Sequence, residues 1–545
     1  RFNWDAPILV SRHDPKRIYH ASQRVWRSDD RGDSWTMVSG DLTRNQDRFD
    51  IEHMGRTWGW DAPWDTYAMS VYNTITSLAE SPLDENLLSA GTDDGLIQVS
   101  ENGGESWREI EVGDLPGVPE TAFVNDIKAD LFDADTVYIA LDNHKYGDYK
   151  PYLLKSTNRG RRWTSIADDL PDRHLVWRLV QDHVDAELMF AGTEFGIFVT
   201  LDGGENWSKL TGNAPTISFR DLAIQRREND LVGATFGRGF WILDDYSVLR
   251  EIDGESLGRE ATLFDTRDAW WYIERTPLGG NRRGSQGHGL YLADNPPFGA
   301  VFTYHLAEGY ASREDQRRER EEAAIAGRGD VAFPDWDVIE AEQRQPDPSV
   351  LLTVRDADGN VVRRLEGPTT AGLHRVAWDL RFPAPNALGA GGGWGEPDGF
   401  MVVPGRYTVE LAKRIEGEVT QLAEPRPFEV VRMRTGALEG AEPAETVAFW
   451  KRLSTMMRKT SAAGRAIDEA REKIEAMSTA LTRSTAEAGE LDAELYGISQ
   501  RLHEIAERLE GRQSMERLNE PQTPTIGERM FVAMVGTGRS TYGPT

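Results

Sequence analysis

Hydrophobic and polar residues alternate along the first half of the chain in short runs that end at glycine-containing turns. Residues 87–99 (LLSAGTDDGLIQV) and 188–199 (LMFAGTEFGIFV) each contain two apolar runs on either side of such a turn. Residues 219–245 repeat this strand–turn–strand pattern. Alternation with a period of two, interrupted by turn glycines, predicts antiparallel β-meanders over residues 1–252.

One short motif occurs four times in this region. It reads Ser/Thr-x-Asp/Asn-x-Gly-x-x-Trp and spans residues 28–35, 100–107, 156–163 and 200–207. The Asp or Asn side chain can accept hydrogen bonds from turn N–H groups, and the glycine can adopt the left-handed conformation that a tight turn needs. We expect each tryptophan to fill the core from the strand that follows. The structural positions are therefore Asp30, Gly32, Trp35, Asn102, Gly104, Trp107, Asn158, Gly160, Trp163, Asp202, Gly204 and Trp207.

The motifs divide the region into units about as long as one propeller blade. The shortest interval between motif tryptophans, from Trp163 to Trp207, is close to one four-stranded blade, and the longer intervals indicate loop insertions. A last unit ends in Asp244-Asp245 without the motif. We count about five blades, and because closed propellers commonly have more, we expect further blades upstream of Arg1.

The four motifs resemble the Asp-box, or BNR, repeat. With FNWDAP (2–7), SPLD (81–84), GTDDG (91–95), GTEFG (192–196) and GRGFW (237–241), their order is similar to that of large bacterial sortilin-type, glycosyl-hydrolase-like BNR propeller proteins. The resemblance implies an exported protein, periplasmic, cell-surface or secreted, of which this chain is the C-terminal half. It implies a fold more than a function, because sialidases, xyloglucanase-type hydrolases and non-enzymatic sortilin receptors share the box.

Residues 290–432 have a different pattern of short alternating runs. Residues 349–363 form a hairpin pattern around an Asp-Gly turn, and residues 372–380 and 404–411 alternate in the same way. This part resembles the immunoglobulin-like sandwich that follows the propeller in the same bacterial proteins. We expect residues 253–289 to be a linker that packs on the propeller. The charged residues 308–345 have few apolar positions, and we expect them to be a solvated or disordered insertion.

The last part of the chain changes to a helical period. Apolar residues step by threes and fours from Leu453 to Leu481 and again from Leu491 to Leu509. This spacing predicts an antiparallel helical hairpin over residues 444–512, followed by an extended tail over residues 513–545. Its apolar stripe packs within the hairpin or forms an oligomer contact. The predicted fold class is therefore mainly β: Asp-box propeller blades, an immunoglobulin-like sandwich and an α-helical hairpin.

Composition excludes several classes of function. Lys and Arg number 62 against 90 Asp and Glu in 545 residues, a net charge of −28, so we expect no nucleic-acid partner. No apolar run is long enough to span a bilayer. The absence of cysteine excludes disulfides, thiolate metal sites and a cysteine nucleophile. The 52 glycines and 17 tryptophans follow in part from the four boxes.

Acidic residues in the blade turns are the candidates for chemistry. A glycoside hydrolase needs two carboxylates that face one cleft. Side chains that could meet on one face of the propeller are Asp93, Asp94, Glu194, Asp244 and Asp245. Aspartate is also common in β-turns for local hydrogen bonding, so each has a structural alternative. We expect no metal site or other cofactor. Calcium at the acidic turn of Asp29, Asp30 and Asp33 is the alternative to a solvated turn.

Two aromatic clusters are the candidates for binding. Residues 49–67 contain Trp58, Trp60, Trp64 and Tyr67, and Trp270 and Trp271 follow the propeller. Aromatic side chains beside polar groups suit sugar rings or peptide side chains, whereas the same residues when buried only close the fold. We expect non-catalytic recognition or scaffolding of a protein, peptide or polysaccharide at the cell envelope. The alternative is a glycoside hydrolase that uses carboxylates of the propeller loops.

Overall fold

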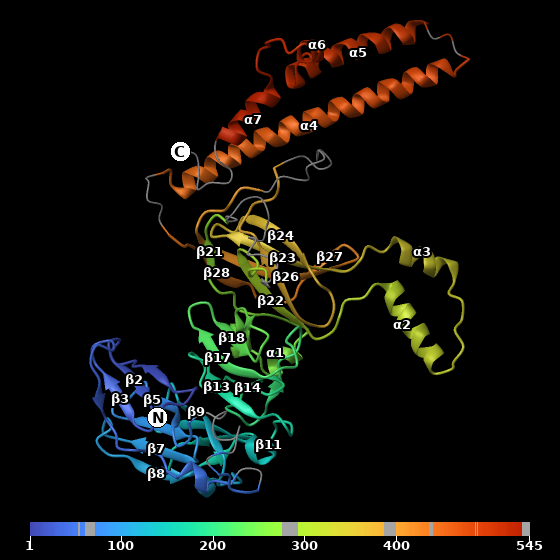
Figure 1. Cartoon of the computed structure of the whole chain (residues 1–545). Coiled ribbons are helices and arrows are strands. Elements are labelled where there is room, and N and C mark those ends of the chain that lie inside the picture. Colours follow the sequence, from blue (N-terminus) through green and yellow to red (C-terminus); the bar gives the residue numbers. More distant parts are fainter. Residues whose placement is uncertain are drawn as a thin grey trace. The chain divides into compact units, whose positions relative to one another are not determined.

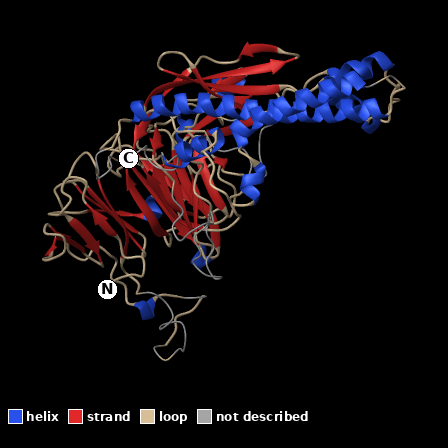
Figure 2. Cartoon of the chain, turned by 90° about the horizontal axis from the view of Figure 1, so that it is seen from above, coloured by secondary structure: helices blue, strands red, loops and turns tan. Residues whose placement is uncertain are grey.

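The chain folds into mainly antiparallel β-sheets and one group of long helices (Figure 1). The computed structural model describes residues 1–52, 55–59, 61, 71–274, 293–385, 399–434, 440–485, 487 and 489–536. These residues form two compact units, Arg1–Glu251 and Ile252–Thr545. Figure 2 shows that strands dominate outside the long helices, so the prediction of a mainly β protein is confirmed.

The first unit is a series of five antiparallel meander sheets, which we number 1 to 5 in chain order. Sheets 1 and 2 contain β1 (Ile8–Val10), β2 (Ile18–Ala21), β3 (Val25–Ser28) and β4 (Thr36–Met37), then β5 (Ile75–Glu80), β6 (Leu88–Thr92), β7 (Leu96–Ser100) and β8 (Arg108–Glu111). Sheets 3 and 4 contain β9 (Phe123–Ala129), β10 (Val137–Asn143), β11 (Asp148–Ser156) and β12 (Thr164–Ser165), then β13 (Val176–Gln181), β14 (Met189–Thr193), β15 (Gly196–Thr200) and β16 (Ser208–Lys209). Sheet 5 contains β17 (Phe219–Gln225), β18 (Asp230–Thr235) and β19 (Phe240–Leu243). Short 3-10 helices lie at η1 (Arg48–Asp50), η2 (Val112–Asp114), η3 (His144–Tyr146) and η4 (Tyr246–Arg250).

Consecutive sheets of this unit pack face to face. In β14, Met189 and Ala191 belong to the core shared with sheet 3, whereas Phe190 belongs to the core shared with sheet 5. Successive side chains of a strand point to opposite faces, so a strand that is apolar at every position is buried on both sides. The first strands β5, β9, β13 and β17 contact one another in turn. Blades of a β-propeller stack in this way.

The four motifs form one repeated turn. In each, the Ser or Thr hydroxyl accepts a hydrogen bond from the glycine N–H, as at Ser100 and Gly104 (2.8 Å). The Asp or Asn oxygen accepts from the main-chain N–H four residues on, as from Ser106 to Asn102 (2.9 Å). Every motif glycine has a φ between +75° and +100°, the left-handed region. The motif is thus a closed hydrogen-bonded turn that ends at its tryptophan.

The motif tryptophans pack on the preceding sheet. Trp107 Nε1 donates to the carbonyl of Val38, which follows sheet 1, and Trp207 Nε1 donates to the carbonyl of Ile166, which follows sheet 3. Trp163 and Trp207 are buried and Trp107 is half-buried. Trp35 is 43% exposed, contrary to the expected core position, because the described chain has no sheet before sheet 1.

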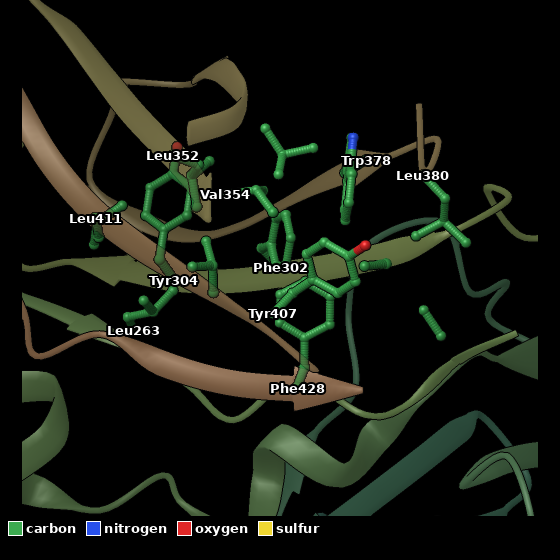
Figure 3. Packing of buried hydrophobic residues seen from close by; sticks show 14 of the residues in the cluster. Leu263, Phe302, Tyr304, Leu352, Val354, Trp378, Leu380, Tyr407, Leu411 and Phe428 are labelled. Atoms are coloured by element: carbon green, nitrogen blue, oxygen red, sulfur yellow. The ribbon is translucent and has the colours of Figure 1, made fainter. Parts of the chain in front are cut away.

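Two sheets of the second unit enclose one core. The smaller contains β20 (Ala261–Leu263), β22 (Ala300–Leu306) and β25 (Gly372–Trp378). The larger contains β21 (Ala269–Trp271), β28 (Arg426–Arg432), β26 (Gly405–Ile415), β23 (Ser349–Asp356), β24 (Val361–Gly367) and β27 (Glu418–Gln421). Phe302, Trp378, Tyr407 and Phe428 meet edge to face or tilted in the shared core (Figure 3). Of the segment expected as a linker, 253–289, residues 253–274 instead supply α1 (Gly254–Gly258), β20 and β21 to this unit, and residues 275–289 lie outside the described residues.

The charged insertion is helical rather than disordered. It holds α2 (Arg313–Ala326) and α3 (Trp336–Arg344), which contact each other. Arg317 of α2 donates to both carboxylate oxygens of Glu342 of α3 and also to Glu321, one turn further along α2. A capping box at Ser312 starts α2. Charge pairs and a cap therefore hold a segment that has little apolar surface to bury.

Long helices follow the second unit's sheets. Helix α4 (Pro443–Thr482) packs against α5 (Gly489–Glu510) over much of its outer half (Figure 1). At the base of α4, Trp450 and Leu453 pack with Phe400 of the preceding loop. The residues expected to form an extended tail contain α6 (Gln513–Arg517) and α7 (Ile526–Gly536), and α7 contacts both long helices.

Candidate binding cavity in the first unit

A cavity of about 500 Å³ opens among sheets 3, 4 and 5. Its walls come from the segments that enter the first strand of each sheet and from the turns that follow the second strand. The lining side chains that carry its chemistry are His144, Trp177, Glu194, Ser218, Arg220 and Phe236, with Tyr149, Arg173 and Phe195 beside them. A cavity of this size with aromatic walls and few polar groups has the usual character of a small-ligand site.

Sheets 2 to 5 each have a β-bulge in their first strand, and two of these bulges direct side chains toward the cavity. The pairing register shifts at Thr76 in β5, at Asn125 in β9, at Trp177 in β13 and at Arg220 in β17. A bulged residue has no partner across the ladder, so its side chain can turn out of the normal alternation. Thr76 and Asn125 bond the carbonyls of Val124 and Val176 in the next sheet, whereas Trp177 and Arg220 line the cavity.

The turn after the second strand supplies the opposite wall. The N–H of Glu194 donates to the Leu175 carbonyl, and the N–H of Phe236 donates to the Ser218 carbonyl. In sheet 2, the N–H of Asp93 donates to the Thr74 carbonyl in the same way. Asp93, Glu194 and Phe236 therefore occupy one structural position in three sheets.

Trp177 is the centre of the cavity's contacts. Its Nε1 donates to Glu194 Oε2 (2.9 Å), and the guanidinium carbon of Arg220 lies 3.6 Å from the centre of its ring. The same guanidinium lies 5.5 Å from the Phe236 ring. The His144 ring meets Trp177 edge to face at 5.9 Å. Cation–π contact and the indole hydrogen bond thus fix the orientations of Arg220 and Glu194.

Two polar groups of the cavity lack a partner among the described residues. The Ser218 hydroxyl is buried, with the residue 6% exposed, and it makes no hydrogen bond there. The Arg220 guanidinium makes no hydrogen bond or ion pair there beyond its aromatic contacts. His144 differs, because its Nδ1 contacts the buried Asp142 carboxylate. Its other ring nitrogen, Nε2, takes no part in that contact.

Asp93 and Asp94 are buried in sheet 2 and bonded within it. Asp93 accepts hydrogen bonds from the Thr74 N–H (2.7 Å), the Thr74 hydroxyl (2.7 Å) and Asn3 Nδ2 (3.2 Å). Asp94 accepts from the Thr92 hydroxyl and the Arg44 N–H. Burial raises the pKa of Asp93 to about 6, against the lowering effect of the Thr74 bonds, and burial also raises the pKa of Asp94. The structure places both carboxylates in a hydrogen-bonded network and not on the cavity wall.

The remaining acidic candidates lie apart from the cavity lining. Asp244 is half-buried directly after β19, and Asp245 caps η4 by accepting from the Ser247 N–H and hydroxyl. Asp29 pairs with Arg17 and Arg27. Asp30 is bonded within its own turn, and bonds from Ser34 and Ser28 lower its pKa to about 2. The part of the chain that the structure describes has no group of three acidic or histidine side chains placed to share a metal ion.

The aromatic candidates separate into three groups. The Arg56 guanidinium lies 3.7 Å from the centre of the half-buried Trp58 ring. Trp60, Trp64 and Tyr67 lie outside the described residues. Trp270 is half-buried in β21, and Trp271 is a core residue of the second unit whose Nε1 donates to the Val402 carbonyl (2.8 Å). The Trp271 side chain is therefore packed in the core and does not offer a surface to a ligand.

Of the sequence candidates that lie among the described residues, the structure brings only Glu194 to the cavity. The sequence analysis did not single out Trp177, Ser218, Arg220 or Phe236 as binding residues. An alignment of GTDDG, GTEFG and ATFGRG by their shared threonine would have placed Phe236 at the position of Glu194. The bulged residues had no such signal, because a bulge interrupts the alternation from which a strand is recognised.

Comparison with known proteins gives low similarity. No family model matches the sequence, and no curated protein matches it. Similar solved structures include a GH74 enzyme of Niastella koreensis (14% identity, 45% of this chain and 36% of that chain, TM-score 0.34). They also include the GH74 xyloglucanase of Xanthomonas campestris (14% identity, 80% of this chain and 65% of that chain, TM-score 0.34). A third is the Cps50 (Swd1) β-propeller domain of Myceliophteria thermophila (12% identity, 49% of this chain and 78% of that chain, TM-score 0.32).

This chain spans 36% to 65% of the length of those two GH74 proteins. The description of the first unit as stacked meander sheets therefore rests on its own strand pairing.

No described helix has the length and apolar character needed to cross a membrane.

Proposed function

We propose that the first unit is a set of propeller blades that recognises a protein, peptide or polysaccharide ligand in the cavity without chemical change. The observation that carries this proposal is a rigid aromatic wall beside unpartnered polar groups. Trp177 fixes Arg220 and Glu194, while the Ser218 hydroxyl and the Arg220 guanidinium have no partner among the described residues. A ligand that pairs these groups would remove the cost of leaving them unsatisfied.

The alternative is a glycoside hydrolase, and one observation favours it. Glu194 lies on the cavity wall, where a carboxylate could act on a bound sugar. Hydrolysis needs a second carboxylate about 5 to 9.5 Å away across the substrate. Glu194 is the only carboxylate among the described residues that line the cavity, and Asp93 and Asp94 are bonded inside sheet 2. Recognition without hydrolysis is therefore the better-supported function.

The proposal extends to the setting of the protein. Likeness of the four turns to the Asp-box supports an exported BNR propeller protein that acts at the cell envelope, with an immunoglobulin-like sandwich as a spacer. Ile197 and Val199 of sheet 4 are buried against sheet 5, whereas Phe240 and Ile242, their counterparts in sheet 5, are 75% and 56% exposed. These apolar faces support further blades as partners.

Ligand arrays combined with a product assay test this function. The full 545-residue chain would be applied to glycan and peptide arrays, and each ligand found would be incubated with the protein and analysed for cleavage products. We expect binding without product release, and we expect Glu194→Gln to weaken binding about fivefold or more. The matched control is Glu205→Gln, an exposed acid in the box turn of the same sheet, which should bind as the wild type does.

Two results would overturn the proposal. Time-dependent product release that Glu194→Gln abolishes and Glu205→Gln retains would establish hydrolysis instead. Absence of binding to every array would remove the recognition function.

A further inference from the structure

Resting on that proposed function, we infer that the cavity selects a carboxylated sugar. In this assignment Arg220 and Ser218 hold the carboxylate, Glu194 accepts from ring hydroxyls, and the exposed aromatic rings cover the apolar face of the sugar.

The charge of the cavity is opposite to that of the chain. The protein carries a net charge of −28, yet the cavity contains Arg173 and Arg220, and neither forms an ion pair among the described residues. Neighbouring arginines are paired: Arg178 with Asp221 (3.3 Å) and Arg250 with Asp182 (2.7 Å). The one carboxylate of the lining, Glu194, already accepts the indole N–H of Trp177. The cavity therefore has an excess of positive charge for an anionic group.

The orientation of Arg220 favours a planar anion. The guanidinium rests on the Trp177 ring at 3.6 Å, so its N–H groups remain available to an acceptor at its edge. A carboxylate matches that fork with two parallel hydrogen bonds, which is the geometry that distinguishes arginine from lysine. Ser218 lies two residues before Arg220 on the same stretch of chain, and its buried hydroxyl can donate a third bond.

A comparison with sheet 2 shows why the Ser218 hydroxyl lacks a partner and which ligand group would supply one. Ser218 corresponds to Thr74 of sheet 2, whose hydroxyl donates to Asp93. At the position of Asp93, sheet 5 has Phe236, which accepts no hydrogen bond. Sheet 5 thus retains the donor and lacks the carboxylate that pairs with it in sheet 2. A ligand carboxylate would restore the pair.

The rest of the lining favours a sugar over an acidic peptide. Tyr149, Phe195 and Phe236 are 49%, 39% and 70% exposed, so their rings are open to the solvent side of the cavity. The second oxygen of Glu194 and Nε2 of His144 are hydrogen-bonding atoms suited to hydroxyls. A uronate ring offers an anion, hydroxyls and an apolar face within one rigid unit, which matches the three kinds of group around one cavity of about 500 Å³. A peptide spreads the same groups over several residues.

Calorimetric titration of the full chain with matched ligands tests the inference. The ligands are oligogalacturonate, its methyl ester, which has the same ring without the charge, and oligoglutamate, which has the charge without the sugar. We expect the uronate to bind about tenfold or more tightly than either of the others. Arg220→Gln should reduce uronate affinity at least about tenfold, and Arg220→Lys should restore only part of it, because lysine keeps the charge and loses the fork.

Controls separate failure of folding from failure of recognition. Arg238→Gln alters an exposed arginine in the turn of the same sheet outside the cavity lining, and it should bind as the wild type does. Thermal unfolding of the Arg220 variants should match that of Arg238→Gln to within a few degrees.

The outcomes distinguish the inference from the function on which it rests. Equal affinity for the uronate and its ester would overturn carboxylate selection and leave recognition standing. Arg220-dependent binding of oligoglutamate alone would replace the sugar with an acidic peptide. Absence of binding to all three ligands overturns the carboxylated-sugar inference, while the array screen decides recognition separately.

Discussion

Sheets 2 and 4 use almost the same sequence and put its acidic residue to different use. Both have Gly-Thr, an acid, one variable residue and Gly between their second and third strands, and both acids donate their N–H to the residue before the first strand. In sheet 2 that residue is Thr74, whose hydroxyl binds Asp93. In sheet 4 it is Leu175, which has no hydroxyl, and Glu194 bonds Trp177 at the cavity instead. The residues before and within the first strand thus separate an acid that is bonded within its sheet from an acid that lines the cavity.

The largest expected contrast is between the box tryptophans of the two sheets. Trp207 of sheet 4 is 6% exposed and bonds the Ile166 carbonyl, whereas Trp107 of sheet 2 is half-buried. We expect Trp207→Ala to lower the free energy of unfolding by about 4 kcal/mol and Trp107→Ala by about 2 kcal/mol, because the cost follows the buried surface lost. Urea unfolding of both variants measures the difference. Equal losses would contradict the burial argument.

The second-largest contrast is expected between Asp93 and Glu194, in the free energy of unfolding that each side chain contributes. Asp93→Ala leaves the Thr74 N–H, the Thr74 hydroxyl and Asn3 Nδ2 without an acceptor in a buried site. We expect a loss of about 3 kcal/mol in the free energy of unfolding. Glu194→Ala removes a half-buried side chain with one hydrogen bond, and we expect a loss of about 1 kcal/mol or less, together with weaker ligand binding. A large loss for Glu194→Ala and none for Asp93→Ala would reverse the assignment of roles.

The smallest expected effect is a pH dependence of stability that arises from Asp93 in sheet 2. The pKa of Asp93 is about 6 in the folded protein against an ordinary value of 3.8 for aspartate, so the folded state holds the proton more tightly than the unfolded chain does. Its contribution to stability is therefore complete below the unfolded value and is lost as the pH rises through about 6. The expected slope is at most about 1.4 kcal/mol per pH unit between these values.

The measurement compares wild type with Asp93→Asn by urea unfolding at several pH values. The difference in unfolding free energy between the two proteins should change between pH 4 and about 6 and stay constant above that range. Parallel curves for wild type and Asp93→Asn would show that Asp93 titrates alike in the folded and unfolded states.

Local chemistry explains what could be predicted from the sequence. The motif turns need Gly104 and its counterparts at positive φ, and this requirement shows directly in the sequence. The alternation around residues 87–99 indicates its strands for the same reason. By contrast, the role of Glu194 depends on Leu175 and Trp177, which reach it only through strand pairing. The sequence analysis does not identify Arg220 as a binding residue, because the bulge that turns it toward Trp177 has no sequence signature.

Segments stabilised by charge also escaped prediction. The acidic and basic residues of 308–345 read as solvated chain, yet Arg317 meets Glu342 across a loop and joins two helices. Such a pair forms only when the two helices lie side by side, and the amino-acid composition of the segment does not predict that arrangement. The segment expected as an extended tail gave a similar result, because Pro521 and Pro524 lie between α6 and α7 and do not prevent either helix.

The bulge that recurs in the first strand of sheets 2 to 5 is a position at which the side chain differs from sheet to sheet. Thr76, Asn125, Trp177 and Arg220 stand at the same step of four successive sheets, outside the ladder that holds each sheet together. A substitution there changes what a sheet presents to its surroundings and leaves the strand pairing on either side in place. A combinatorial library confined to the two members that line the cavity, Trp177 and Arg220, would therefore vary the cavity wall while the strand pairing on either side stays in place.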